Sequence, residues 1–116
     1  MRRLILILCA VALVAGPVFG STYKRLETIA VAGTAVGLSA TTISPSGYPQ
    51  MRQCVGRLET AEIRFRYDGT DPTSAVGQLL EPLEILTLSD FTDISQLKMI
   101  RTTSTSASIT FVCSAP

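Results

Sequence analysis

The chain has 116 residues, of which 47% are hydrophobic and 16% are charged, and it contains no histidine. The lack of histidine excludes Ser-His-Asp and Cys-His mechanisms and removes the commonest metal ligand. We therefore expect no enzyme activity, no cofactor and no bound metal. Ten Lys and Arg against nine Asp and Glu give a formal net charge of +1, which is not the basic surplus of nucleic-acid-binding proteins.

The first twenty residues have the layout of a secretory signal peptide. Two arginines form a basic start, residues 4–15 are an uninterrupted apolar run, and Gly16 and Pro17 break any helix. The run is shorter than the roughly 20 apolar residues that a membrane-spanning helix needs. We therefore expect cleavage after Gly20 and export to the periplasm or the exterior, with no stable membrane span afterwards. A retained anchor is the alternative.

Removal of residues 1–20 would leave 96 residues (116 − 20). Their net charge would be −1, because the leader contains two of the ten basic residues and none of the nine acidic ones. This length suits one small domain with a modest hydrophobic core. We divide it into a linker at 21–27 and a single β-sandwich domain at 28–116.

Short segments rich in Val, Ile, Thr, Phe and Leu alternate with Gly, Pro, Ser and Asp from Thr28 onward. This pattern predicts an all-β fold, a small antiparallel β-sandwich of the jelly-roll or immunoglobulin-like type. We expect the first strand at 28–31 and a second apolar piece at 33–38. A loop should occupy 44–49, where two prolines and a glycine oppose regular strand pairing.

The clearest strand signal lies at 61–67, where apolar and charged residues alternate strictly before an Asp-Gly turn pair. Strand side chains alternate between two faces. We therefore expect Ile63, Phe65 and Tyr67 to face the core.

The preceding strand begins near Arg52 and should direct Cys54 and Leu58 inward. The inward positions thus change from even to odd numbers between the two strands. A β-bulge or a sharp bend around Glu59 and Thr60 would explain this change, because one extra residue reverses the face of every later side chain.

The C-terminal part of the chain continues the pattern of short elements with one exception, a single helical turn that follows a capping Asp. In chain order we expect a loop through Gly77, a strand at 82–88, the helical turn at 91–96, a strand at 97–102 and the last strand at 107–113.

Two cysteines remain after the leader, which is the even number that an oxidising compartment favours. Cys113 shares a strand face with Ile109 and Phe111, and Cys54 shares one with Leu58. Both cysteines could therefore point into one core and form a disulfide, worth roughly 4 kcal/mol by the chain-entropy relation. Two buried free thiols are the alternative.

Glu62, Arg64 and Arg66 lie on the face of the 61–67 strand opposite to its apolar residues. A mixed-sign, solvated sheet face explains them simply, in which case replacement of both arginines should leave stability nearly unchanged. The alternative is that this face is an interface with another protein.

One pair of carboxylates could in principle bind calcium, and two further pairs could perform acid/base chemistry. The regular twelve-residue calcium loop is absent, and turn or loop roles are the simpler interpretation of each pair. The pairs are Asp68 with Asp71, Glu81 with Glu84, and Asp90 with Asp93.

Segments 33–40, 59–73, 100–102 and 106–112, taken in order, resemble the small β-rich proteins encoded among the structural genes of tailed bacteriophages and prophages. The similarity covers most of residues 27–113. It implies a virion-associated, non-enzymatic protein, a head decoration or tail accessory component. It also implies contacts with itself or a larger virion protein and a homo-oligomeric state, and it transfers no catalytic residues.

The leader and the cysteines depart from that family, because phage particles assemble in the cytoplasm whereas a signal peptide sends a chain out. Three interpretations stay open: a start codon placed too early, an exported phage-encoded protein, and a bacterial surface protein with the same fold. The leading hypothesis is therefore a structural protein of a phage particle, located in the virion. The alternative is an exported bacterial envelope or periplasmic binding domain that Cys54 and Cys113 stabilise.

Overall fold

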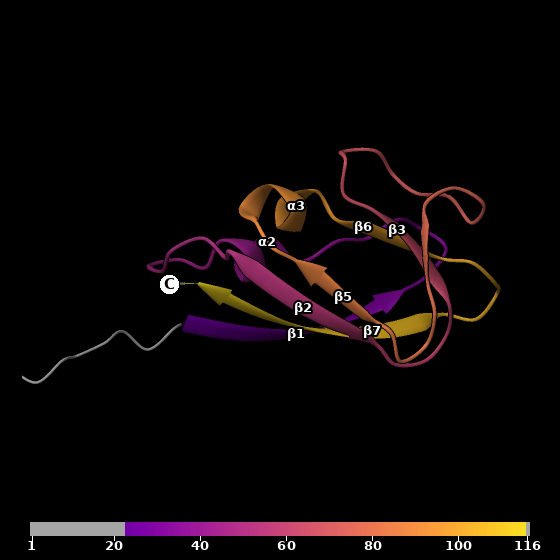
Figure 1. Ribbon diagram of the computed structural model, residues 1–116, viewed down its shortest axis with the longest axis horizontal. Helices are drawn as coiled ribbons and strands as arrows, with labels where there is room; N and C mark the ends of the chain where they lie inside the picture. The colour runs from indigo at the N-terminus through magenta and orange to yellow at the C-terminus, as the bar shows by residue number, and fades with distance from the viewer. Residues whose placement is uncertain (1–22, 116) are drawn as a thin grey trace, which may run out of the picture.

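The computed structural model describes residues 23–115, so the expected leader and its cleavage site lie outside the described residues. Within 23–115, two antiparallel sheets and two short helices form the fold (Figure 1). No helix in this range is long and apolar enough to cross a membrane. The elements are β1 (Tyr23–Val31), α2 (Ala40–Ile43), β2 (Gln53–Leu58), β3 (Ile63–Arg66), β4 (Gln78–Leu80), β5 (Ile85–Leu88), α3 (Phe91–Gln96), β6 (Lys98–Arg101) and β7 (Ala107–Ala115).

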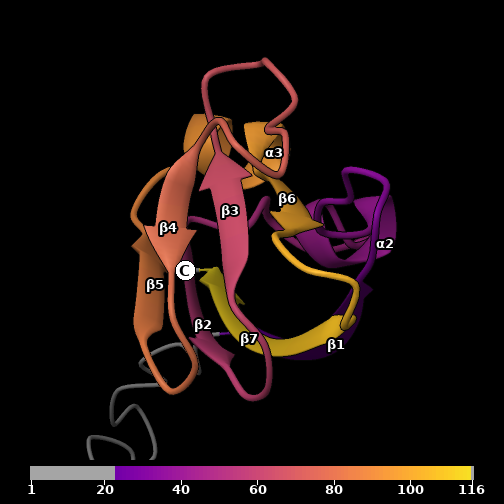
Figure 2. The same cartoon turned by 90° about the vertical axis from the view of Figure 1, so that its right-hand side faces the viewer.

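The two sheets lie face to face (Figure 2), which confirms the expected small β-sandwich. Sheet A has four strands in the order β1-β7-β2-β5, and sheet B has three in the order β4-β3-β6. The last strand of the chain therefore lies between the first two. It pairs with β1 along its whole length, from Tyr23 opposite Ala115 to Val31 opposite Ala107.

This strand order differs from both finer fold types that the sequence suggested. A constant-type immunoglobulin domain divides its seven strands into ABED and CFG sheets, whereas here the last strand joins the first and second. A jelly roll has eight strands, and residues 23–115 contain seven.

Several element boundaries differ from the sequence prediction. β1 starts at Tyr23, so most of the expected linker at 21–27 is strand. The polar residues in the first part of β1 gave no strand pattern in the sequence, but pairing with β7 holds these residues in extended form. The sequence prediction had no strand between the loop through Gly77 and residue 82, whereas β4 begins at Gln78. The expected strand at 82–88 begins only at Ile85, because Leu83 has a φ of 72° and belongs to a turn.

The change of inward parity has a simple structural origin. β2 ends at Leu58 in sheet A and β3 begins at Ile63 in sheet B, and the chain bends at Thr60 and Ala61 between them. The sharp-bend alternative is thus confirmed, because each strand belongs to a different sheet. Tyr67 was expected inward but is 36% exposed, because β3 ends at Arg66 before the alternation reaches it.

A single hydrophobic core fills the space between the sheets. Ile109, Phe111 and Cys113 from β7 are fully buried, as are Cys54 and Leu58 from β2. Gly56 faces Phe111 across the β2–β7 pair, and a Cβ at this glycine would lie 2.4–2.8 Å from three atoms of the phenyl ring. Phe111 therefore occupies the space that any side chain at position 56 would need.

We predict that Gly56→Ala lowers the free energy of unfolding by about 1–3 kcal/mol, the usual range for overpacking a well-filled core. Gly33→Ala is the matched control, because its Cβ would meet only the flexible end of Arg101, at 3.3 Å. Urea denaturation of both variants measures the difference. Equal stabilities for Gly56→Ala and the parent protein would contradict this account of Phe111.

Candidate interaction surfaces

The predicted disulfide is present and joins neighbouring strands of sheet A. Cys54 and Cys113 lie directly opposite each other on β2 and β7, with a sulfur–sulfur distance of 2.03 Å. Both residues are fully buried. Their 59-residue separation closes most of the described domain into one covalent loop. The bond therefore restricts the unfolded chain and fixes β7 against β2.

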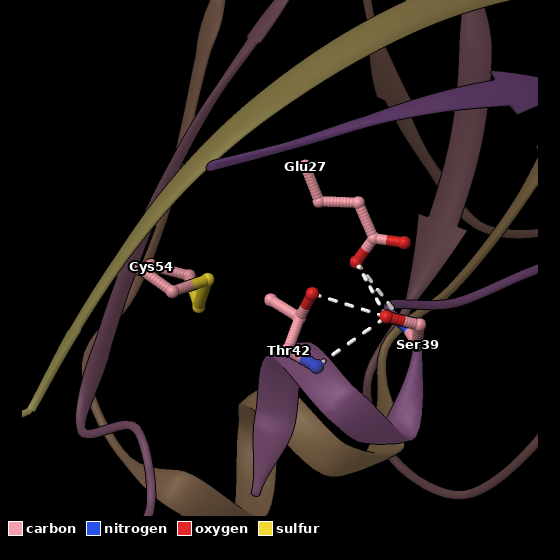
Figure 3. The surroundings of a disulfide bond; sticks show 5 residues. Glu27, Ser39, Thr42 and Cys54 are labelled. Carbon is pink, nitrogen blue, oxygen red and sulfur yellow. Dashed lines mark hydrogen bonds between the residues drawn. A yellow bond between two sulfur atoms is a disulfide. The ribbon is translucent and has the colours of Figure 1, made fainter. Parts of the chain in front are cut away.

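A polar network lies close to this disulfide and attaches the short helix α2 to β1 (Figure 3). The backbone N–H and the hydroxyl of Ser39 both lie 3.1 Å from Oε1 of Glu27. The Ser39 hydroxyl also caps α2, where it accepts from the N–H of Thr42 and lies 3.0 Å from the Thr42 hydroxyl. Thr42 is 2% exposed, and the hydrogen bond between the Ser39 and Thr42 hydroxyls satisfies its buried hydroxyl.

Replacement of both cysteines by alanine should lower the free energy of unfolding by about 2–5 kcal/mol, the range found when small secreted domains lose a disulfide. Guanidinium denaturation of oxidised parent, reduced parent and Cys54→Ala/Cys113→Ala measures the effect. The reduced parent controls for lost side-chain packing, since it retains both sulfur atoms. The assignment would be overturned by reduced and oxidised parent unfolding at the same denaturant concentration.

The three charged residues expected on one face of β3 all have partners within the chain. Glu62 accepts from the Thr102 hydroxyl at 2.9 Å. Arg64 donates through one terminal nitrogen to the Gly77 carbonyl at 2.8 Å and through Nε to the Ser74 carbonyl at 3.2 Å. The side chain of Arg64 therefore anchors the loop that leads into β4.

Arg66 forms an exposed ion pair with Asp68, in which Nε donates to Oδ1 at 3.1 Å. The hydrogen bond from Arg66, followed by that from the Thr70 N–H, holds the pKa of the Asp68 carboxyl below its usual value. The same carboxylate raises the pKa of the Arg66 guanidinium. Because the folded-state pKa of Asp68 is lowered, the ionised Asp68 carboxylate stabilises the fold at pH values above the ordinary carboxyl pKa. This stabilisation is lost as the pH falls through the folded-state pKa of Asp68.

We predict that Arg64→Ala lowers the free energy of unfolding by about 1–3 kcal/mol, because two carbonyls of the 74–77 loop lose a charged donor. Arg66→Ala is the matched control, and its effect should be clearly smaller because exposed ion pairs contribute little. Thermal and urea denaturation of both variants gives the comparison. An Arg64→Ala change no larger than that of Arg66→Ala would show that the loop is held by other contacts.

Open surface pockets on the described part of the chain include one at sheet B and one at α3. The first, of about 310 Å³, lies beside the ion pair at the end of sheet B, and the second, of about 300 Å³, lies beside α3. Phe65 and Tyr67 stack in the wall of the first, with ring centroids 6.1 Å apart. The first is lined by Phe65, Arg66, Tyr67, Asp68, Val76, Gly77 and Gln78, and the second by Gln50, Arg52, Ser89, Asp90, Phe91 and Thr92.

The candidate carboxylates mostly take turn and capping roles. Oδ1 of Asp68 accepts from the Thr70 N–H, and the Asp90 side chain caps α3 by accepting from the Asp93 N–H at 2.8 Å. The side chain of Glu84 accepts from the Glu81 N–H at 2.7 Å. Between residues 23 and 115, no group of three or more metal-ligating side chains is close enough to hold an ion.

The outer face of sheet A carries an exposed feature that the sequence analysis missed. Leu26, Val112 and Val55 lie in register on adjacent strands, and we call them the apolar row. They are 65%, 42% and 38% exposed, respectively. Polar residues flank the row on both sides, with Thr28, Thr110 and Arg57 in register on one side and Lys24, Ser114 and Gln53 on the other.

A contiguous exposed apolar feature with a polar rim is typical of an interaction surface. Alternation in the sequence already placed Val112 on the other face of its strand from Ile109 and Phe111, so the outward direction of Val112 was predictable. What the sequence lacked was the order β1-β7-β2, which brings three distant residues into one line. The predicted charged face of β3, in contrast, makes the internal bonds described above.

No family model matches this chain, and no curated protein or solved structure is significantly similar to it.

Proposed function

We propose that this chain is a non-enzymatic β-sandwich protein that acts through protein–protein contacts after export, in the bacterial envelope or periplasm. The apolar row carries this proposal. Three apolar side chains exposed side by side on the outer face of a sheet lose solvent contact favourably when another protein covers them. The polar rows on either side would then form the rim that is usual around a buried interface core.

The disulfide supports the exported location. Disulfides persist in oxidising compartments and are rare in the cytoplasm. Cys54 and Cys113 are paired in the core of a small domain, whose hydrophobic core is necessarily modest. The signal-peptide pattern of residues 1–20 gives independent support from the sequence.

A structural protein of a phage particle, a head decoration or tail accessory component, is the second candidate. The resemblance of 33–40, 59–73, 100–102 and 106–112 to virion-associated proteins favours it. Such a protein would use the same apolar row for contacts with itself or with a larger virion protein. The two candidates therefore share a mode of action and differ in the place where the chain is found.

Peptide mass spectrometry without reduction, on a periplasmic extract and on purified particles from the source strain, separates the two candidates. We expect the extract to contain a peptide that begins at Ser21 and a linked pair of peptides containing Cys54 and Cys113. Recovery of the chain in particles, and not in the extract, would favour the virion candidate and contradict the leading one.

Contact through the apolar row is tested by placing a photo-crosslinking residue at Val112 in cells. Val76 is the matched control, since it is a valine of similar exposure, 51% against 42%, outside sheet A. We expect crosslinks to protein from position 112 and few from position 76. Equal crosslinking from both positions would remove the support for this surface.

A further inference from the structure

β1 is a long strand with a free edge. Sheet A places it outermost, so β7 covers one of its sides, and no described residue forms a backbone hydrogen bond with its other side. β1 has nine residues, whereas the other edge strands, β4, β5 and β6, have three, four and four. A long free edge is a ready template for pairing with another strand.

The hydrogen-bond alternation determines which groups of β1 face outward. In the β2–β7 pair the Glu59 N–H donates to the Ser108 carbonyl at 2.8 Å. The even-numbered residues of β7 therefore bond β2, and its odd-numbered residues bond the odd-numbered residues of β1. The N–H and C=O groups of Lys24, Leu26 and Thr28 are thus directed at the free edge.

We propose that two copies of this chain pair β1 with β1, antiparallel, about a two-fold axis at Leu26. This register places Leu26 opposite Leu26 of the second copy and Lys24 opposite Thr28, and the backbones of these residues form about six hydrogen bonds. It also places Arg25 opposite Glu27 of the second copy, twice. Sheet A then continues without interruption from one copy into the other.

Charge complementarity favours this register over the registers that have the two-fold axis at another residue of β1. Symmetry requires that an axis at a residue place that residue opposite itself. An axis at Lys24 or Arg25 would oppose two like cations, and an axis at Glu27 would oppose two carboxylates. An axis at Thr28 would pair no opposite charges. Only the axis at Leu26 sets two pairs of opposite charges directly across the junction, where such pairs are stabilising.

Both charged groups are available for this pairing. The guanidinium of Arg25 has no ion pair or hydrogen bond with residues 23–115, and Arg25 is exposed. Glu27 uses Oε1 to accept from Ser39, and no described residue donates to its Oε2. The bonds from Ser39 hold the carboxylate in place, so little side-chain freedom remains to be lost on association.

The same axis also extends the apolar row. Leu26 is the end of the row in each copy, and pairing at Leu26 joins the two rows end to end across the junction. The combined row then runs along the outer face of one continuous sheet. The pairing therefore enlarges the surface on which the proposed function rests, and it assigns a second copy as the partner of β1.

Sedimentation of the purified, oxidised protein should show a dimer. Arg25→Glu should raise its dissociation constant by about tenfold or more, because each dimer then contains two like-charge pairs. Mixing Arg25→Glu with Glu27→Arg should restore the dimer, since opposite charges again face each other at both positions. A monomeric parent protein, or an Arg25→Glu variant that dimerises as tightly as the parent, would overturn the pairing.

Cysteine crosslinking tests the register without altering the Ser39 contact. Leu26→Cys should form a disulfide-linked dimer, because its two Cα atoms would lie about 5.5 Å apart, within disulfide range. Thr28→Cys is the matched control, with its two Cα atoms about 14 Å apart in this register. Crosslinking of Thr28→Cys as fast as Leu26→Cys would overturn the pairing. The β1 pairing rests in part on the proposed function, but a negative result in these two tests would not change the results of mass spectrometry or of crosslinking at Val112. The two proposals can therefore be contradicted separately.

Discussion

The insertion of β7 between β1 and β2 is the constraint on which the rest of the fold depends. It joins the end of the chain to two strands near its beginning, and the disulfide between Cys54 and Cys113 fixes that position covalently. The register that places the two cysteines opposite each other also buries Phe111 over Gly56. A strand slip of one residue would turn Phe111 and Cys113 to the solvent. The packing of Phe111, the disulfide and the register of β2 with β7 therefore all depend on the same strand pairing.

The same register determines the outer face of sheet A. Because alternate residues point in opposite directions, a β7 that directs Cys113 inward must direct Val112 outward. Pairing then aligns it with Leu26 and Val55. The direction of the exposed apolar row is thus a geometrical consequence of how the core is built. Its apolar side chains at solvent positions are the observation on which the proposed contact with another protein rests.

Sheet B has a different relation to its surface charges. Arg64 lies on the solvent face of its strand, yet its guanidinium is bonded to carbonyls of the loop before β4. Alternation identifies the face of such a residue but not its hydrogen-bond partners, because these come from a segment ten or more residues away. A charged strand face in the sequence is therefore weak support for an interface, and the structure directs attention to the uncharged row on the other sheet.

The sequence by itself determined the β class, the inward residues of most strands and the capped turn at 91–96. It left the pairing of Cys54 with Cys113 as one of two alternatives, and the structure decided between them. The first three follow from local alternation and turn chemistry, and the candidate disulfide followed from the inward positions that alternation gives Cys54 and Cys113. It could not supply the start of β1, the strand order or the apolar row. Those features depend on which strand lies beside which, and that choice is made by long-range backbone pairing, which leaves no periodic signal along the chain.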